Sequence, residues 1–334
     1  MKHFNIPLFV PHKGCPNDCV FCNQKRITSN IKSVTGEDVE KIISEHLKTL
    51  PQDAYIEAAF FGGSFTGIPM EEQKELLSVA KAYYDKGLIS GIRLSTRPDY
   101  ISYEILDLLK SKSVTTIELG VQSLDSEVLK KSNRGHDESV VIKSSEMIKE
   151  YGFSLGLQMM TGLPGDTFEK SVETAEKFIK IKPDFVRIYP TLVIKDTELE
   201  NMYNSGAYIP QSIDDAVRLC KHLKVNFLEN DIQVIRVSLQ PTDEISPDAS
   251  VVAGPFHPAF GELVDNEIFY DIISDITKDL TDCKVTVAVD VKDVSKAIGN
   301  KKINIKRLKS ERNIDLFVKG IKNIDSRIKL IGVE

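Results

Sequence analysis

The feature that most constrains the fold is the alternation of short β-rich runs with longer helical stretches over residues 5–239. The β-rich runs cover 5–10, 54–61, 91–95, 115–121, 153–159, 185–189 and 233–239. The helical stretches cover 37–48, 70–86, 103–111, 138–151, 168–181 and 213–230. Such alternation is typical of βαβ units with a parallel sheet. Six or more units favour a partial or complete (β/α) TIM-like barrel of the α/β class, in which chemistry collects at the carboxyl ends of the strands.

The pattern changes near the C-terminus. Valines alternate with other residues over 284–290, which predicts a strand, and helices are expected over 291–298 and 303–311. Further strands are expected over 314–318 and 327–333. We therefore expect a barrel over 1–245, a capping segment and linker helix over 246–282, and a small basic α+β subdomain over 283–334.

Charge is unevenly distributed along the chain. The net charge is −6, yet residues 296–329 contain 11 Lys or Arg and 3 Asp or Glu, a net of +8. A basic tail on an acidic body favours a polyanion site, and a solvated helix face is the alternative. The sequence has no long apolar run and no signal peptide at its start, so we expect no membrane span and a cytoplasmic location. The sequence leaves the oligomeric state open.

Three of the five cysteines lie within eight residues: Cys15, Cys19 and Cys22. An odd number of cysteines without a secretory signal argues against a disulfide framework. Thiolates are suited to zinc or to iron–sulfur clusters. A zinc site needs four protein ligands, of which His12 is a candidate, whereas three cysteines leave one iron of a four-iron cluster open to an external ligand.

The cysteine spacing, with Phe21 before the last cysteine, resembles the signature of the radical S-adenosylmethionine (SAM) superfamily. The resemblance implies a 4Fe–4S cluster on Cys15, Cys19 and Cys22, with SAM bound at the open iron. It also implies cleavage of SAM to a 5′-deoxyadenosyl radical, and an external one-electron donor. The cofactor supplies that chemistry, while the protein orients it and excludes water.

Polar and glycine-rich segments follow the predicted strands, and the same resemblance implies that they bind SAM. Gly62-Gly63-Ser64 is similar to the glycine-rich stretch that binds the methionine amino group, although the superfamily often has Glu in place of Ser64. Arginine is suited to a carboxylate, and an ion pair with Asp99 or Glu118 is the alternative for Arg97. The predicted cofactor-binding residues are Phe21, Gly62, Gly63, Ser64, Thr96, Arg97, Gln122, Leu163 and Pro164.

Longer strings resemble the radical SAM domain of the catalytic subunit of Elongator, a tRNA-modifying enzyme. They cover 95–99, 117–123, 133–136 and 187–191. The first cysteine spacing is shorter here, and no segment corresponds to that family's acetyltransferase domain, so acetyl-CoA chemistry is not implied. On the substrate side, Tyr189 and Lys195 follow the sixth predicted strand and are candidate catalytic groups.

Residues 297–308 resemble the helix–GxxG–helix core of a KH RNA-binding domain, with Lys302 in place of the last glycine. In that module the loop clamps single-stranded nucleotides. The resemblance implies RNA-binding roles for Gly299, Lys301, Lys302, Lys306 and Arg307.

Together these features predict a radical SAM enzyme that modifies RNA, with a tRNA nucleoside as the favoured substrate. One alternative is a radical SAM enzyme acting on a small molecule such as a tetrapyrrole. Another is an RNA-binding protein with a structural metal site.

Overall fold

The computed structural model describes residues 2–10, 18–22, 34–51, 53–239, 245–247, 249–324 and 326–334. The chain divides into two compact units. One comprises residues 1–211 and 227–254, and the other comprises residues 212–226 and 255–334. Among the described residues, no helix combines the length and apolar character that a membrane span requires.

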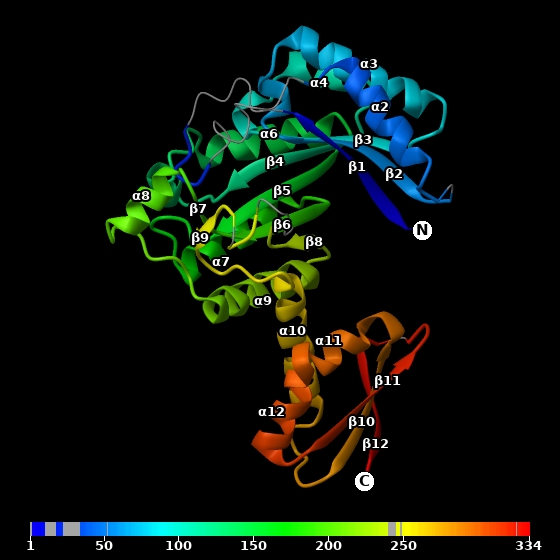
Figure 1. Ribbon diagram of the computed structural model, residues 1–334, viewed down its shortest axis with the longest axis vertical. Helices are drawn as coiled ribbons and strands as arrows, with labels where there is room; N and C mark the ends of the chain where they lie inside the picture. The colour runs from blue at the N-terminus through cyan, green and yellow to red at the C-terminus, as the bar shows by residue number, and fades with distance from the viewer. Residues whose placement is uncertain are drawn as a thin grey trace. The chain divides into compact units, whose positions relative to one another are not determined.

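Seven parallel strands curl into a half-barrel in the larger unit, in the order β1-β2-β3-β4-β5-β6-β8 (Figure 1). They are β1 (His3–Val10), β2 (Tyr55–Gly62), β3 (Gly91–Thr96), β4 (Thr116–Gln122), β5 (Ser154–Thr161), β6 (Phe185–Pro190) and β8 (Gln233–Val237). Each overlaps one of the seven predicted β-rich runs. The partial TIM-like barrel expected from the alternation is therefore confirmed.

Helices follow the strands and cover the outer face of the half-barrel (Figure 1). They are α2 (Gly36–Leu47), α3 (Met70–Asp85), α4 (Tyr103–Ser111), α6 (Glu138–Glu150) and α7 (Phe168–Ile181). Thr35, Ser102, Asp137 and Thr167 accept hydrogen bonds from first-turn backbone N–H groups of α2, α4, α6 and α7. These caps satisfy donors that have no partner within the helix. A sixth predicted helix is α9 (Ile213–Glu229), whose residues are shared between the two units.

Short elements between the main ones were not predicted. A two-stranded antiparallel ribbon joins β7 (Val193–Ile194) to β9 (Val251–Ala253). Two short helices, α5 (Ser126–Lys131) and α8 (Glu198–Asn204), are also present. Three single turns were also not predicted: η1 (Phe65–Gly67), η2 (Pro98–Tyr100) and η4 (Asn300–Lys302). A fourth single turn, η3 (Val291–Asp293), falls within the helix predicted over 291–298.

A row of buried charges runs along one face of the half-barrel sheet. Arg93 on β3 pairs with Glu57 on β2 at 2.8 Å and lies 3.8 Å from Glu118 on β4. Glu118 also pairs with Arg187 on β6 at 2.9 Å and accepts a hydrogen bond from Gln158 on β5. The four charged side chains join four strands that lie far apart in the sequence, so their alternating signs bind the sheet together.

The C-terminal unit contains a three-stranded sheet in the order β11-β10-β12 (Figure 1). Its elements are α10 (Phe260–Ile276), β10 (Lys284–Asp290), α11 (Val294–Ile298), α12 (Ile303–Arg312), β11 (Asp315–Ile321) and β12 (Ile328–Val333). Strand β10 is parallel to β11 and antiparallel to β12. One face of the sheet contributes Val287 and Leu316 to a core that also holds Ile273 and Leu308. The predicted strands and helices of this region are therefore present.

Candidate active site

The cysteine loop is described from residue 18 to residue 22, so Cys15 and His12 lie outside the described residues. Cys19 is buried and Cys22 is partly buried, and the Cys22 N–H donates to the Cys19 carbonyl at 2.9 Å. The Val20 N–H donates to the Ser132 carbonyl at 3.2 Å. The Asn133 side chain donates to the Asp18 carbonyl at 2.9 Å. The turn after α5 therefore holds the cysteine loop in place.

Arg134 lies against this loop, and no role was predicted for it. Its Nη1 is 3.2 Å from Cys19 Sγ, and its Nη2 donates to the Gly120 carbonyl near the end of β4. The residue is only 6% exposed. A guanidinium is permanently charged, so it stabilises negative charge near this sulfur. In the sequence, Arg134 stands out only as part of the Elongator-like string 133–136, and nothing in that string indicates that it contacts Cys19.

The ends of β2 and β3 are joined through Ser64. Its hydroxyl lies 2.9 Å from Thr96 Oγ1 and accepts a hydrogen bond from the Arg97 N–H at 3.0 Å. Gly62 has a φ of +110°, and a Cβ there would lie 2.7 Å from the Val10 carbonyl oxygen. Both the positive φ and the close approach of the Val10 carbonyl therefore require glycine at position 62.

Arg97 is buried and its guanidinium has partners within the protein. It pairs with Asp99 through Nε at 2.8 Å and Nη2 at 2.9 Å, and Nη2 also donates to the Arg134 carbonyl at 2.5 Å. The ion pair with Asp99 was the alternative considered from the sequence. Arg97 thus supports the residue that contacts Cys19.

Gln122 is the last residue of β4, and its backbone conformation is unusual for a residue other than glycine. Its φ is +73°, and the pairing of β4 with β5 shifts register between Gly120 and Gln122. The side chain is 8% exposed, and its Oε1 has no hydrogen-bond partner among the described residues. A buried acceptor without a partner is costly, so this oxygen is available to a ligand.

The loop after β5 is held from both sides. Leu163 and Pro164 are buried. The Gly162 N–H donates to Asp166 at 2.7 Å, and the Tyr208 hydroxyl donates to the Gly162 carbonyl at 2.6 Å. Burial raises the pKa of Asp166, while its hydrogen bonds to Ser171 and Gly162 act in the opposite direction.

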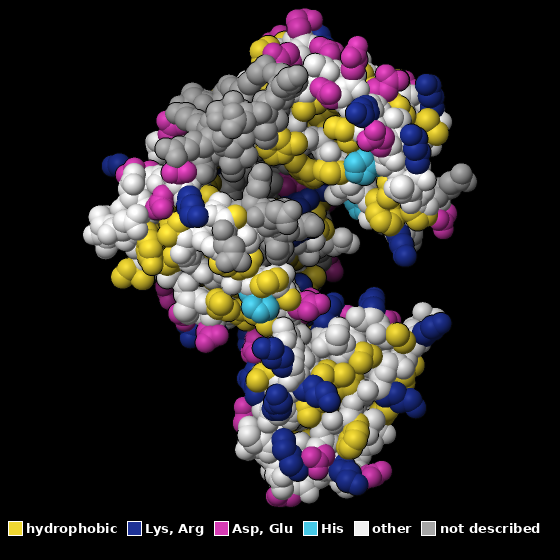
Figure 2. Space-filling model, in the orientation of Figure 1, with side chains coloured by type: hydrophobic (Ala, Val, Ile, Leu, Met, Phe, Trp, Pro, Cys, Tyr) yellow, Lys and Arg dark blue, Asp and Glu magenta, His cyan; other side chains and the backbone are white. Residues whose placement is uncertain are grey.

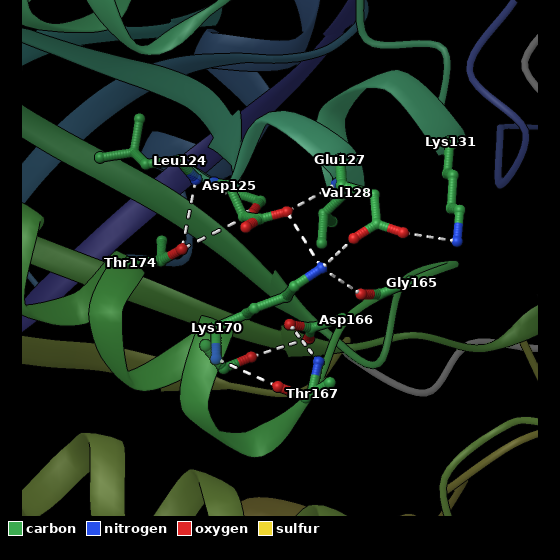
Figure 3. A network of polar contacts seen from close by, with 12 residues as sticks. Leu124, Asp125, Glu127, Val128, Lys131, Gly165, Asp166, Thr167, Lys170 and Thr174 are labelled. Carbon is green, nitrogen blue, oxygen red and sulfur yellow. Dashed lines mark hydrogen bonds and ion pairs between the residues drawn. The ribbon is translucent and has the colours of Figure 1, made fainter.

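Lys170 joins this loop to α5 (Figure 3). Its ammonium lies 2.6 Å from Glu127 and 3.4 Å from Asp125, and it donates to the Gly165 carbonyl at 2.9 Å. Glu127 also pairs with Lys131 at 2.7 Å. The strand-end loops that follow β4 and β5 are therefore connected by one network of charges.

Three other predicted residues, Tyr189, Lys195 and Phe21, have contacts of their own. Tyr189 is partly buried on β6, with its hydroxyl 3.4 Å from Arg187 Nη1, and burial raises its pKa. Lys195 is exposed after β7, and its backbone N–H donates to the Ser250 carbonyl. Phe21 packs against a small cluster formed by Val20, Val193, Leu199 and Tyr208.

His136 is a further buried polar group that the sequence did not single out as a site residue. It is 9% exposed, and neither ring nitrogen has a hydrogen-bond partner among the described residues. Burial, followed by the positive charge of Arg134, lowers its pKa to about 4. The imidazole is therefore neutral at physiological pH and keeps one nitrogen able to accept a hydrogen bond.

Comparison with known proteins gives several relatives. The chain is 31% identical to human Elongator complex protein 3 over 196 residues, which cover 52% of this chain and 36% of that protein. It is 35% identical to a tRNA uridine(34) acetyltransferase of Methanocaldococcus infernus over 137 residues, 39% of this chain and 25% of that protein. The chain thus spans only about a quarter to a third of the length of these two relatives.

A solved structure has a similar fold. An archaeal Elp3 from Methanocaldococcus infernus that lacks part of its N-terminus superposes with a TM-score of 0.63 at 23% identity, covering 82% of this chain and 63% of that chain. The Radical SAM C-terminal domain matches residues 183–269. The Radical SAM superfamily matches residues 9–178, about half of the sequence. The chain belongs to the radical SAM superfamily.

Proposed function

We propose that this radical SAM enzyme modifies a nucleoside of RNA, with tRNA as the favoured substrate. The observation that carries the proposal is the similarity to Elongator complex protein 3 and to a tRNA uridine(34) acetyltransferase. Family membership favours an enzyme over an RNA-binding protein with a structural metal. The similarity to a tRNA uridine(34) acetyltransferase favours RNA over a small molecule such as a tetrapyrrole.

Radical SAM proteins use a 4Fe–4S cluster and SAM. Of the three predicted cluster ligands, Cys19 and Cys22 are among the described residues and Cys15 is not. Cys15, Cys19 and Cys22 would hold the cluster. The buried Arg134 guanidinium beside Cys19 offsets negative charge, and the unpartnered Gln122 Oε1 is available to SAM. When bound, the cluster and SAM supply one-electron cleavage of SAM and hydrogen-atom abstraction, and an external one-electron donor is required.

The predicted SAM-binding residues fall into two groups in this proposal. Gln122 is assigned to SAM directly because its buried Oε1 has no hydrogen-bond partner among the described residues, and Gly62 and Gly63 are assigned to SAM from the resemblance of this segment to the glycine-rich stretch of the superfamily. Side chains that are already engaged within the protein position the site instead. This second group comprises Phe21, Ser64, Thr96, Arg97, Leu163 and Pro164.

Replacing Arg134 by Met is expected to lower the reduction potential of the cluster. A nearby positive charge stabilises the reduced form, which carries the extra electron. The shift should be on the order of 60 mV, a tenfold change in a one-electron equilibrium. Redox titration of the reconstituted protein, followed by electron paramagnetic resonance, measures it. Arg134→Lys keeps the charge and should retain most of the potential; equal potentials in wild type and Arg134→Met would contradict the assignment.

Tyr189 and Lys195 remain the candidate catalytic groups on the substrate side. The Arg187 guanidinium near the Tyr189 hydroxyl keeps that side chain oriented within the half-barrel. Lys195 is exposed, which suits a contact with a large substrate better than with SAM.

The loop between α11 and α12 is the second part of the RNA proposal. Gly299, Lys301 and Lys302 all have positive φ, and a Cβ on Gly299 would lie 2.7 Å from Ile303 Cγ2. Lys301, Lys302 and Lys306 are exposed, and in this proposal they contact the phosphates of the RNA. Arg307 instead pairs with Glu267 at 2.6 Å and stacks 3.5 Å above the Tyr270 ring. In this proposal it therefore stabilises the loop and does not contact a phosphate.

Replacing Lys301, Lys302 and Lys306 together by Gln is expected to weaken tRNA binding and flatten its salt dependence. Each phosphate contact that is lost removes counterion release. Binding is measured by filter retention at several salt concentrations. The matched control is Lys41→Gln with Lys48→Gln, two exposed lysines at α2. Unchanged affinity in the triple variant would remove this loop from the proposal.

The proposed reaction is tested by mass spectrometry of tRNA nucleosides from cells with and without the protein, combined with anaerobic crosslinking to cellular RNA. Loss of one modified nucleoside in the deletion strain supports the proposal. Binding of a porphyrin with no RNA affinity would favour the small-molecule alternative.

A further inference from the structure

The sheet of the C-terminal unit exposes several large hydrophobic side chains. Two large hydrophobic residues of β11, Phe317 and Ile321, are exposed and lie on the face opposite the core residue Leu316. Leu330 and Val333 of β12 are also exposed, but they pair with the core residues Val287 and Val285 and so lie on the other face. Phe317 is the most exposed of them at 54%. In Figure 2, hydrophobic side chains and Lys or Arg side chains are interspersed over the visible surface of this unit. An exposed aromatic ring close to basic side chains is the combination that binds single-stranded nucleic acid.

The register of the sheet shows which residues share its outer face. Leu316 enters the core, so the next residue, Phe317, points to the opposite side. Phe317 pairs with Thr286 on the central strand, which in turn pairs with Gly332. The neighbours of the ring across the sheet are therefore small. A flat molecule can reach the ring without displacing a large side chain.

The next row of the same face is basic. Ala288 pairs with Lys319 on one side and with Lys329 on the other. Both lysines are exposed, and neither ammonium forms an ion pair with a carboxylate of the described residues. The aromatic ring thus lies two residues along the strand from a pair of cations.

Other charges on this face lie at the ends of the strands. Lys284, Asp315 and Glu334 are at one end, and Asp315 pairs with Lys309 at 2.9 Å. Asp290 is at the other end and accepts a hydrogen bond from the Lys292 N–H. The surrounding segment, residues 296–329, has a net charge of +8. The centre of the face therefore offers an aromatic ring and positive charge together.

We propose that this outer face, formed by Thr286, Phe317, Lys319, Lys329 and Gly332, binds an unpaired stretch of RNA. A base stacks on Phe317, while Lys319 and Lys329 contact the flanking phosphates. Aromatic residues bind bases in this way because every base has a π-face, and lysines follow the backbone. The proposal rests on RNA being the substrate. It adds a site on the sheet, separate from the loop that contains Lys301 and Lys302, and it selects RNA with a single-stranded segment.

The test measures binding of the full chain to a labelled oligouridine of about ten nucleotides and to a fully paired RNA duplex. Wild type is expected to prefer the single strand. Phe317→Leu should weaken oligouridine binding about tenfold through lost stacking, whereas Phe317→Tyr should retain it. Tyr103→Leu removes an exposed ring from α4 in the other unit and is the control. Thermal unfolding shows whether each variant is folded.

Replacing Lys319 and Lys329 by Gln should reduce the slope of log affinity against log salt concentration by about 1.4, because a single strand contributes about 0.7 per contact. Equal affinity of wild type and Phe317→Leu for oligouridine would overturn the sheet site but leave RNA as a possible substrate. Failure of wild type to bind any RNA would instead remove the proposed function as well. A dimer that Phe317→Leu dissociates, without any change in RNA affinity, would show that the face binds a second copy and would overturn the proposal.

Discussion

Cys19→Ala is expected to abolish both the visible absorption of the 4Fe–4S cluster and the cleavage of SAM. In the proposed site, three cysteines bind three of the four irons and the fourth iron is open to SAM. Loss of Cys19 would leave a second iron without a protein ligand. The variant is prepared anaerobically, reconstituted with iron and sulfide, and compared with wild type by absorption spectroscopy and by release of 5′-deoxyadenosine.

The matched control is Cys283→Ala. Cys283 is a free cysteine like Cys19, but it is only partly buried and packs against the core of the C-terminal unit. It should retain cluster absorption and SAM cleavage. Cluster absorption of wild-type intensity in Cys19→Ala would show that Cys19 is not a ligand.

Glu118→Ala is expected to destabilise the half-barrel by about 3–5 kcal/mol, because it leaves buried charge without a partner. Glu118 has no solvent exposure and faces both Arg187 and Arg93, which are themselves at least nine-tenths buried. Denaturant unfolding monitored by circular dichroism measures the change.

An exposed ion pair provides the comparison for this prediction. Asp215 pairs with Arg218 at 2.9 Å, and both side chains are more than half exposed. Asp215→Ala should change the unfolding midpoint little, since such pairs contribute weakly. If Glu118→Ala unfolded at the same denaturant concentration as wild type, the buried row of charges would not be what joins these strands.

The half-barrel could be predicted from the sequence because its signals are long and repeated. Seven apolar strands alternate with helices of nine or more residues, and each helix has a clear amphipathic pattern or a capping residue. The ribbon of β7 and β9 could not be predicted, because a strand of two residues carries no periodicity. Helices α5 and α8 have six and seven residues and are too short for the same reason.

The sequence predicts where the candidate site lies, at the carboxyl ends of the strands, but it does not predict the partners of the side chains there. Strand-end residues such as Ser64, Thr96 and Gln122 were recognised because the carboxyl ends of parallel strands share one edge. The contact of Arg134 with Cys19 joins residues 115 positions apart, and no local pattern indicates it. Likewise, the sequence gives no sign that Gln122 adopts a positive φ, or that Arg307 is held by Glu267 while nearby lysines are exposed.

The division of α9 between the two units limits how the protein can be dissected. Lys221 pairs with Asp271 at 2.6 Å and Lys224 with Asp265, so the middle of the chain supplies ionic partners to α10. A fragment starting at residue 255 would lack Lys221 and Lys224 and would leave Asp271 and Asp265 without these two partners. Truncation is therefore a poor way to obtain the C-terminal half for biochemistry, and point substitutions in the intact polypeptide are the informative route.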